Sequence, residues 1–270
     1  MRSNYHTHSV YCDGRDTPAE MAAAAFSLGF SALGFSGHMD PAFSGCGMTP
    51  EKEAAYRRDI ALLKAEYAGR MEIYCGIEQD ILSGRRDPFY DYAIGSVHWI
   101  EKDGRHLCVD WSAEKTAQNI ADFYHGDACA YAADYYAMVA RVKEKTGCDI
   151  IGHFDLLTKF DEAAEMFSGD DPRYRAAVLP ALDALCMPGE IFEINTGAIA
   201  RGYRKTPYPA LWILRELHRR RCAIMLNSDC HDRTKLTCGF DIACRLAREA
   251  GFDSQVVLLG GRFQEAPLPE

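Results

Sequence analysis

The stretch Asn4-Tyr5-His6-Thr7-His8, followed after a short turn by Asp13, decides how the rest of the chain is interpreted. In an extended strand successive side chains alternate between the two faces, so His6 and His8 point the same way and can share one metal ion. Asp13 can reach the same ion from the loop beyond. A lone His-x-His is equally compatible with two histidines on a half-exposed strand, so the choice depends on whether similar residues recur.

Strands and helices alternate along the chain, which predicts an α/β architecture with a mainly parallel sheet. Thr17-Pro18 and Thr49-Pro50 each combine an N-cap residue with a proline at the first helical position, and so mark two helix starts. A last apolar run at 256–259 is predicted as an eighth strand or an edge. The main strands are predicted from seven apolar runs, at residues 4–8, 32–36, 71–77, 92–97, 148–152, 190–195 and 223–227.

The interval from Trp99 to Lys145 is the longest between predicted strands. Gly104, Gly126 and several acidic residues divide it into a loop, a short helix and one long helix near 128–145. An insertion of this size after a strand is often functional.

Six of the seven predicted strands run into a His, Asp or Glu, and the remaining one ends at Asn195 with Arg201 close behind. In a barrel of parallel strands all C-terminal ends open on the same face, where such folds place their chemistry. Taken alone, Glu78 or Asp229 could cap a helix, and His98 could be a hydrogen-bonded core histidine. Their recurrence in register favours a metal centre built from nine residues: His6, His8, Asp13, His38, Glu78, His98, His153, Asp229 and His231.

Length and composition limit the possible classes of protein. The 270 residues are 48% hydrophobic and contain no repeat, low-complexity tract or linker, so one domain over 1–270 is expected. The formal charge of −9, with no basic cluster larger than Arg219–Arg221 at the expected end of a helix, argues against nucleic acid as a partner. Eleven cysteines without a Cys-x-x-Cys motif, scattered through apolar segments, indicate reduced core thiols.

Targeting signals are also missing from the sequence. No signal peptide precedes His6, and no apolar run approaches the roughly 20 residues of a membrane span. We therefore expect a cytoplasmic protein without a membrane partner, and leave its oligomeric state open.

The order of these motifs resembles the polymerase-and-histidinol-phosphatase (PHP) superfamily over residues 4–231. The chain size and the segments Gly95–His98, Gly152–Leu156 and Glu193–Thr196 resemble its stand-alone histidinol-phosphate phosphatases. The resemblance implies a single-domain, distorted (β/α)7 TIM-like barrel that binds two to three divalent metals and hydrolyses a phosphate monoester, most simply L-histidinol phosphate in histidine biosynthesis.

The resemblance also implies how the nine ligands are divided. Their mixture of imidazole and carboxylate suits Zn²⁺, Mn²⁺ or Fe²⁺ rather than the all-oxygen shells of Ca²⁺ or Mg²⁺. Cys12 and Cys230 adjoin ligands but are interpreted as packing residues. The implied groups are His6, His8, Glu78 and Asp229 for one metal, a bridging Glu78 with His98 and His153 for the second, and Asp13, His38 and His231 for the third.

The expected reaction is attack of a metal-bridging hydroxide, because a water between two cations loses its proton near neutral pH. No side-chain nucleophile is required, and the sequence has neither a Gly-x-Ser-x-Gly elbow nor a His-Glu-x-x-His motif nor a phosphate-cradling glycine loop. In this interpretation Glu78 bridges metals, Asp229 or a bound water protonates the leaving group, and Arg201 is the third catalytic residue.

A phosphate dianion needs donors beyond the metals, and Arg201 and Lys159 follow two predicted strands at the rim. The planar fork of arginine favours Arg201 as the main clamp. Arg204 and Lys205 are near enough in sequence to take its place.

The rest of a histidinol phosphate would meet Trp99 or Tyr124, stacked on the imidazole, and Asp110, which could pair with the ammonium. Two alternatives remain open. A phosphoesterase of the same superfamily could act on a nucleotide, a sugar phosphate or a phosphoprotein, and the shape of the 99–126 insertion would discriminate. A non-catalytic metal-binding or assembly module would be expected to have lost ligands, whereas here every position is filled.

Overall fold

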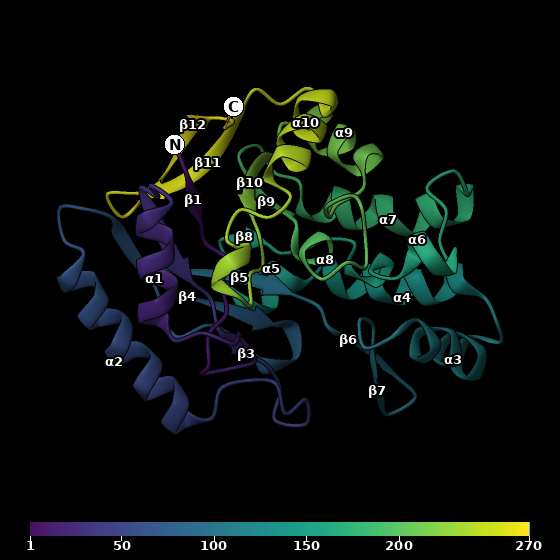
Figure 1. Cartoon of the computed structure of the whole chain (residues 1–270). Coiled ribbons are helices and arrows are strands. Elements are labelled where there is room, and N and C mark those ends of the chain that lie inside the picture. The colour runs from purple at the N-terminus through teal and green to yellow at the C-terminus, as the bar shows by residue number, and fades with distance from the viewer. Residues whose placement is uncertain (270) are drawn as a thin grey trace.

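The computed structural model describes residues 1–269 and shows a nearly closed barrel of parallel strands surrounded by helices (Figure 1). Every neighbouring pair along the barrel is parallel, which confirms the predicted (β/α)7 architecture. The short strand β3 (His38–Met39) pairs with β4 beyond the end of β2. The barrel order is β1 (Ser3–Asn4), β2 (Ala32–Phe35), β4 (Glu72–Asp80), β5 (Tyr92–Ser96), β8 (Ile150–Ile151), β9 (Ile191–Asn195) and β10 (Ala223–Asn227).

The barrel closes between the first and last strands through a parallel bridge from Thr7 to Cys230. The amide of His8 donates to the carbonyl of Cys230 at 2.8 Å, and the amide of Cys230 donates to the carbonyl of His6 at 3.1 Å. The predicted ligand motifs at opposite ends of the sequence are therefore held together by backbone hydrogen bonds.

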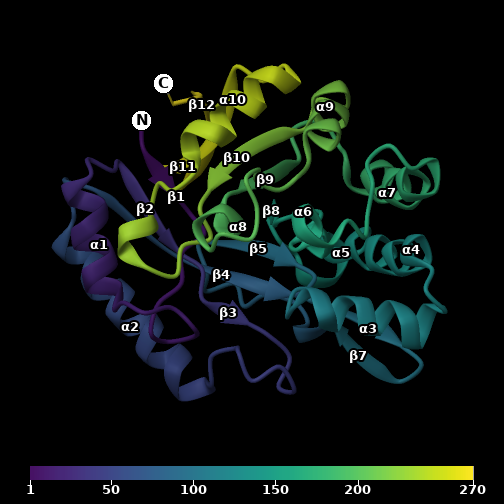
Figure 2. The same ribbon diagram turned by 45° about the vertical axis from the view of Figure 1, so that its right-hand side comes forward.

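Helices cover the outside of the barrel, with α1 and α2 on one side and α3, α4 and α7 on the other (Figure 2). The helices α1 and α2 begin at the predicted Thr-Pro pairs: Thr17 and Thr49 both cap the backbone, and Glu20 completes a capping box. The helices are α1 (Pro18–Ser27), α2 (Pro50–Glu66), α3 (Ala113–Tyr124), α4 (Ala128–Val139), α5 (Val142–Thr146), α6 (Asp161–Ala164), α7 (Pro172–Leu185), α8 (Gly197–Ala200), α9 (Leu211–Arg219) and α10 (Phe240–Ala250).

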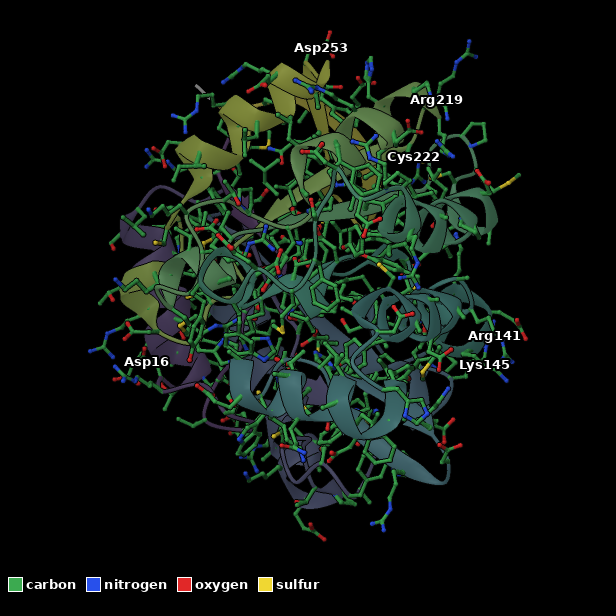
Figure 3. All side chains as sticks on the ribbon, turned by 90° about the vertical axis from the view of Figure 1, so that its right-hand side faces the viewer. Asp16, Arg141, Lys145, Arg219, Cys222 and Asp253 are labelled. Carbon is green, nitrogen blue, oxygen red and sulfur yellow. The ribbon has the colours of Figure 1, made fainter. Side chains whose placement is uncertain are left out.

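The prediction of one long helix near 128–145 is wrong, because the helix breaks after Val139. The first part, α4, packs against α7, whereas α5 packs against β5, so the chain changes direction between them. The basic cluster Arg219–Arg221 lies at the end of α9, as predicted. Arg219 is at the outer edge of the molecule (Figure 3) and pairs with Glu216 at 2.7 Å.

Two antiparallel hairpins differ from the predicted elements. The segment predicted as a loop after Trp99 forms β6 (Trp99–Lys102) and β7 (Arg105–Cys108). Its turn residues Asp103 and Gly104 both have positive φ, at 48° and 70°, and an Asp-Gly pair is a hairpin signal that the prediction overlooked. The run at 256–259 belongs to β11 (Ser254–Leu259), which pairs with β12 (Arg262–Pro267) instead of adding an eighth barrel strand.

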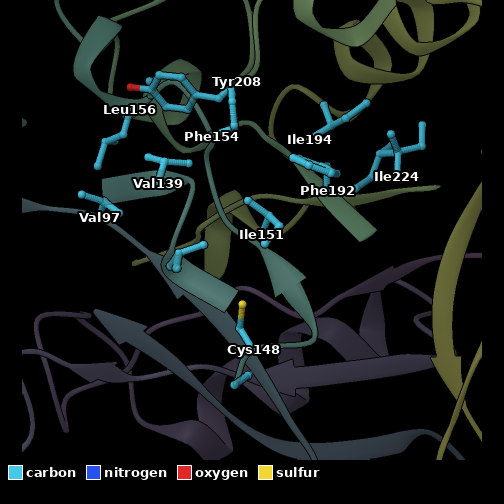
Figure 4. Packing of buried hydrophobic residues seen from close by; sticks show 14 of the residues in the cluster. Val97, Val139, Cys148, Ile151, Phe154, Leu156, Phe192, Ile194, Tyr208 and Ile224 are labelled. Carbon is cyan, nitrogen blue, oxygen red and sulfur yellow. The ribbon is translucent and has the colours of Figure 1, made fainter. Parts of the chain in front are cut away.

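Two hydrophobic clusters hold this arrangement together. The larger lies between the sheet and the helices, and part of it is shown in Figure 4, where Phe154 packs on Phe192 with ring centroids 5.8 Å apart. The smaller joins inward-facing strand residues to the β11–β12 hairpin, and the Tyr5 hydroxyl donates to the carbonyl of Leu258 at 2.8 Å. This hairpin covers the N-terminal end of the barrel, so the C-terminal end is left to carry the site.

All eleven cysteines are free, and six of them are buried, in agreement with the predicted thiols. Over residues 1–269, no helix combines the length and the apolar character needed to cross a membrane.

Candidate metal centre

The predicted ligands come together at the C-terminal ends of the barrel strands. Each of the nine arrives from a strand end or the loop beyond it, which places residues 225 positions apart in sequence around one centre. By origin they are His6, His8 and Asp13 after β1, His38 in β3, Glu78 in β4, His98 after β5, His153 after β8, and Asp229 and His231 after β10.

Glu78 lies at the middle of this arrangement. Its Oε1 is 2.9 Å from His153 Nε2 and 3.4 Å from His98 Nε2. Its Oε2 is 3.0 Å from His38 Nδ1 and 3.2 Å from His6 Nε2. One buried carboxylate therefore faces imidazoles from four different strand ends, which is the position a bridging ligand requires.

Asp229 approaches the same two imidazole nitrogens, Nε2 of His6 and Nε2 of His8, that Glu78 Oε2 faces. Its Oδ1 is 3.2 Å from His8 Nε2 and 3.7 Å from His6 Nε2, while Oδ2 accepts a hydrogen bond from Arg201 Nη2 at 2.8 Å. The backbone of Asp229 has φ +47°, a left-handed conformation that aspartate tolerates better than most residues. This local turn follows β10 directly and directs the carboxylate back over the barrel.

The outermost group surrounds Asp13. Its carboxylate oxygens are 3.0 Å from His231 Nε2, 3.6 Å from His38 Nε2 and 3.7 Å from His8 Nδ1. The rings of His8 and His231 are stacked with centroids 4.1 Å apart. His8 therefore lies between two groups, with Asp229 on one side and Asp13 on the other, whereas the expected division placed it in one group only.

The potential ligand atoms form overlapping sets, and within each set all atoms lie within 4.8 Å of one another. His6, His8, His38 and Glu78 each belong to two of them. The sets built from the predicted ligands are His8, Asp13, His38 and His231; His6, Glu78 and His153; His6, His8 and Asp229; and His38, Glu78 and His98.

The donor atoms fit divalent cations. Within the described chain, the buried side-chain atoms without a hydrogen-bond partner include His6 Nε2, His8 Nε2, His38 Nδ1 and Glu78 Oε2. Leaving such atoms unpaired costs about 1–3 kcal/mol each, so their convergence indicates cations as the missing partners. Imidazole nitrogens mixed with carboxylates are the ligands of first-row transition metals.

Burial and mutual charge shift the pKa values of the clustered side chains in both directions. Burial would raise the pKa of Glu78, but the surrounding histidines, His6 foremost, outweigh it and hold this pKa well below its ordinary value. Burial, together with the like charges of His231 and His38, lowers the pKa of His8 to about 3. The Glu78 carboxylate is therefore ionised and His8 is neutral at pH 7, which are the forms that coordinate a metal. Burial would lower the pKa of His6, His38 and His98, but the neighbouring carboxylates outweigh it and raise these pKa values well above the ordinary value, so these three rings must release a proton when they bind a metal.

Two outer carboxylates were missed by the sequence interpretation. Asp80 accepts hydrogen bonds from the amide of His98 at 3.0 Å and from its Nδ1 at 3.1 Å. Asp40 Oδ1 lies 3.6 Å from His38 Nδ1. A signal for both was present, because each is two residues beyond a predicted ligand and strand side chains two apart share a face.

The centre forms the floor of a cavity of about 610 Å³. Four of the predicted substrate-binding residues line it: Trp99, Asp110, Lys159 and Arg201. Lys159 Nζ donates to the Asp110 carboxylate at 2.9 Å. Burial would raise the pKa of Asp110, but Lys159 lowers it to about 2, so this carboxyl group is ionised at pH 7. Trp111, which is 72% exposed, also lines the cavity and was not predicted.

The other predicted substrate residues lie outside this cavity. The buried guanidinium of Arg204 donates to the carbonyl of Thr158 at 3.3 Å and lies over the ring of Tyr208. Lys205 is exposed, and its amide donates to Glu162. Neither residue lines the cavity that Arg201 lines.

Three further sequence expectations can be placed. Tyr124 is buried and donates to Asp134 at 2.9 Å, so it packs between helices rather than in the cavity. The Cys230 thiol donates to the carbonyl of Asp232 at 2.7 Å and packs inward, in agreement with a packing role. The Sγ atom of Cys12 lies 3.5 Å from Nδ1 of His8.

A parallel α/β barrel with clustered histidines and carboxylates at its C-terminal face defines a metal-centred barrel protein. The PHP domain family matches residues 4–197, and the chain belongs to this family. It is 30% identical to the probable histidinol-phosphatase of Deinococcus radiodurans over 261 residues, which cover 91% of this chain and 92% of the relative. It is 26% identical to the histidinol-phosphatase of Bacillus subtilis over 251 residues, covering 84% and 92%.

Two solved structures share the fold. One is the putative histidinol phosphatase of Listeria monocytogenes, with a TM-score of 0.73 and 20% identity, covering 89% of this chain and 99% of the other. The second is the histidinol phosphate phosphatase of Lactococcus lactis, complexed with zinc, L-histidinol and phosphate, with a TM-score of 0.69 and 20% identity, covering 97% and 98%. At this identity both matches confirm the fold of the barrel.

Proposed function

We propose that this protein is a metal-dependent phosphomonoesterase that hydrolyses L-histidinol phosphate to L-histidinol and phosphate. The convergence of four imidazoles on the buried Glu78 carboxylate, at the floor of a cavity that Arg201 lines, carries the proposal. It is supported by two relatives that are named histidinol-phosphatase and that this chain matches over most of their length. The Lactococcus lactis protein of the same fold is complexed with zinc, L-histidinol and phosphate.

The centre would hold two to three divalent transition metals, with Zn²⁺, Mn²⁺ and Fe²⁺ as the candidates. Divalent cations supply Lewis acidity that activates a water near neutral pH and draws charge from phosphoryl oxygens. The proposed ligands are the predicted ones: His6, His8, Asp13, His38, Glu78, His98, His153, Asp229 and His231.

Arg201 is the proposed phosphate clamp. Its side chain is 31% exposed and lines the cavity, while Nη2 is anchored on Asp229 Oδ2 and Nη1 lies 3.1 Å from His231 Nδ1. A guanidinium anchored on one side keeps its orientation and can donate further N–H groups to phosphoryl oxygens. Asp229 then acts in two ways, as a ligand through Oδ1 and as the anchor of Arg201 through Oδ2.

The organic part of the substrate would lie toward the β6–β7 hairpin. Trp99 on this hairpin presents an aromatic surface for an imidazole. The rings of Phe43 and Trp99 pack edge to face, with centroids 5.2 Å apart. The Asp110–Lys159 pair beside it offers a carboxylate for an ammonium and an ammonium for the phosphate. Both charges are already paired with each other, so a substrate that carries both signs can exchange partners without leaving a buried charge alone.

A panel of phosphate esters tests the proposal, with protein whose metal content has been measured. We expect histidinol phosphate to give the highest kcat/KM. A higher kcat/KM for a nucleotide, a sugar phosphate or a phosphopeptide would overturn the proposed substrate but would agree with the proposed phosphoesterase activity. Metal-loaded protein that hydrolyses none of the esters would contradict the proposed activity itself.

A further inference from the structure

Glu193 is a fully buried carboxylate on β9 that the proposed reaction does not use. Its Oε1 is 2.6 Å from His6 Nδ1 and accepts from Asn227 Nδ2 at 3.0 Å. Its Oε2 accepts from the backbone amide of His153 at 2.9 Å and from Asn195 Nδ2 at 2.9 Å. A single side chain therefore contacts two of the proposed ligands, one through its ring and one through its backbone.

The orientation of both asparagines is determined by the backbone. Asn227 Oδ1 accepts from the amide of Tyr5 at 2.8 Å, and Asn195 Oδ1 accepts from the amide of Gly197 at 2.8 Å. Since a backbone N–H can only donate, each asparagine must turn its Nδ2 toward Glu193. Both oxygens of Glu193 are therefore surrounded by N–H donors, an environment that only an ionised carboxylate satisfies.

This environment determines the tautomer of His6. Because Oε1 can only accept, Nδ1 of His6 must carry a proton, and when the ring is neutral its lone pair is on Nε2. Nε2 is the buried atom that lies 3.2 Å from Glu78 Oε2 and has no hydrogen-bond partner in the described chain.

We propose that Glu193 is a positioning residue that holds His6 in the Nδ1–H tautomer, so that Nε2 is available as a metal ligand. The inference rests on the proposed metal-dependent function. A carboxylate that accepts from the far nitrogen of a ligating histidine orients the ring and makes it a better donor. Through the amide of His153, the same carboxylate also fixes the backbone that carries a second ligand.

The change Glu193→Gln tests this with almost no change in volume. An amide has one accepting and one donating end, so its NH₂ must meet either His6 and Asn227 or the His153 amide and Asn195 Nδ2. Neither of the latter two groups can become an acceptor, but His6 can, by moving its proton to Nε2. We therefore expect the NH₂ to turn toward His6 and its Nε2 to become protonated and unable to bind metal.

Glu190→Gln is the matched control. Glu190 immediately precedes β9, is also buried and pairs with Lys143 far from the metal centre. Both variants lose a buried carboxylate, so both should melt at a lower temperature. Only Glu193→Gln should weaken zinc binding, measured by competition with a chelator, by roughly 10- to 100-fold.

The outcomes separate the two proposals. If the unaltered protein binds no transition metal, the proposed function fails and this inference fails with it. If the unaltered protein binds metal and Glu193→Gln binds it equally tightly, only the role of Glu193 is overturned. Equal loss of affinity in Glu190→Gln would mean that destabilisation, not positioning, is responsible, and would also overturn it.

A second measurement needs no variant of Glu193 and therefore does not depend on Glu193→Gln folding. In zinc-loaded protein with ¹⁵N-labelled histidine, ring nitrogen shifts report which nitrogen is protonated and which is ligated. We expect His6, assigned by the signal missing from His6→Gln, to show a protonated Nδ1 and a metal-bound Nε2. A ligated Nδ1, or a proton on Nε2, would contradict the inference.

Discussion

Arg201 Nη2 donates to Asp229 Oδ2 at 2.8 Å, while the other oxygen of Asp229 faces His8 Nε2 at 3.2 Å. One carboxylate thus joins the proposed phosphate clamp to the proposed metal ligands. Burial would lower the pKa of Arg201, but the charge of Asp229 outweighs it and raises that pKa, so the guanidinium stays charged at any pH at which the protein is folded.

This relationship predicts the behaviour of Arg201 variants. A guanidinium on the phosphoryl oxygens holds the substrate and, more tightly, the transition state, so Arg201→Ala should raise KM and lower kcat together. The loss should be about 2–4 kcal/mol of transition-state stabilisation, or roughly 30- to 1000-fold in kcat/KM. Arg201→Lys should recover only part, because it keeps the charge and loses the planar fork. Steady-state kinetics on histidinol phosphate, with metal analysis of the same samples, measure both effects.

Lys205→Ala is the natural comparison, because Lys205 is exposed and lies outside the cavity. Its kinetics should match those of the unaltered protein. If Arg201→Ala leaves kcat/KM unchanged while Lys205→Ala lowers it strongly, the phosphate is held elsewhere.

Metal content is the second prediction. The nine converging side chains should retain two to three equivalents of first-row transition metal through purification, and chelators should abolish activity. Elemental analysis before and after chelation, followed by adding back single metals, measures this directly. Folded protein that has never met a chelator, contains no such metal and still hydrolyses phosphate esters would disprove the metal-dependent reaction.

Glu78→Gln is the third prediction. The change removes one charge from the carboxylate that faces four imidazoles, so two metal positions should weaken together. Activity should fall by more than the roughly 10- to 100-fold typical of outer residues. Glu72→Gln, at the exposed start of the same strand, is the control and should leave metal content unchanged. Normal turnover with full metal content in Glu78→Gln would show that this carboxylate is not a bridge.

The fourth prediction concerns the barrel core. A Cβ at Gly76 would collide with the ring of Tyr92, which is fully buried and whose hydroxyl donates to the carbonyl of Phe35 at 3.0 Å. Gly76→Ala should therefore lower the free energy of unfolding by about 1–3 kcal/mol, measured by urea denaturation. Leu62→Ala, at a position 64% exposed, should change it by less than about 0.5 kcal/mol. Equal effects would mean that the Tyr92 ring moves aside without cost.

The sequence alone determined the strand order and the location of the ligands, for two physical reasons. Strands buried on both faces require continuous apolar runs, and each run was visible in the sequence, as at 148–152 and 223–227. Parallel strands also bring all their C-terminal ends to one face, so the His, Asp or Glu residues after six of the seven runs had to meet, whatever the helices between them did.

Hairpins and helix breaks could not be predicted as well, because they depend on what surrounds them. The Asp103-Gly104 turn was visible as a signal, but the short segments beside it alternate too weakly to indicate strands. The break after Val139 arises from two different packing partners, α7 and β5, that no local pattern contains.

Within the site, only the tertiary structure decided which residues act together. Arg201, Arg204 and Lys205 are near neighbours in sequence, yet the turn after α8 sends Arg201 to Asp229 and Arg204 to Thr158. In the sequence, Glu193 is one of several residues in a predicted buried strand. Only the fold brings its Oε1 to 2.6 Å from Nδ1 of His6, which is 187 positions away. The spacing of residues along a strand determines which face a side chain takes, but its hydrogen-bond partners come from other strands, and only the closed barrel brings those strands together.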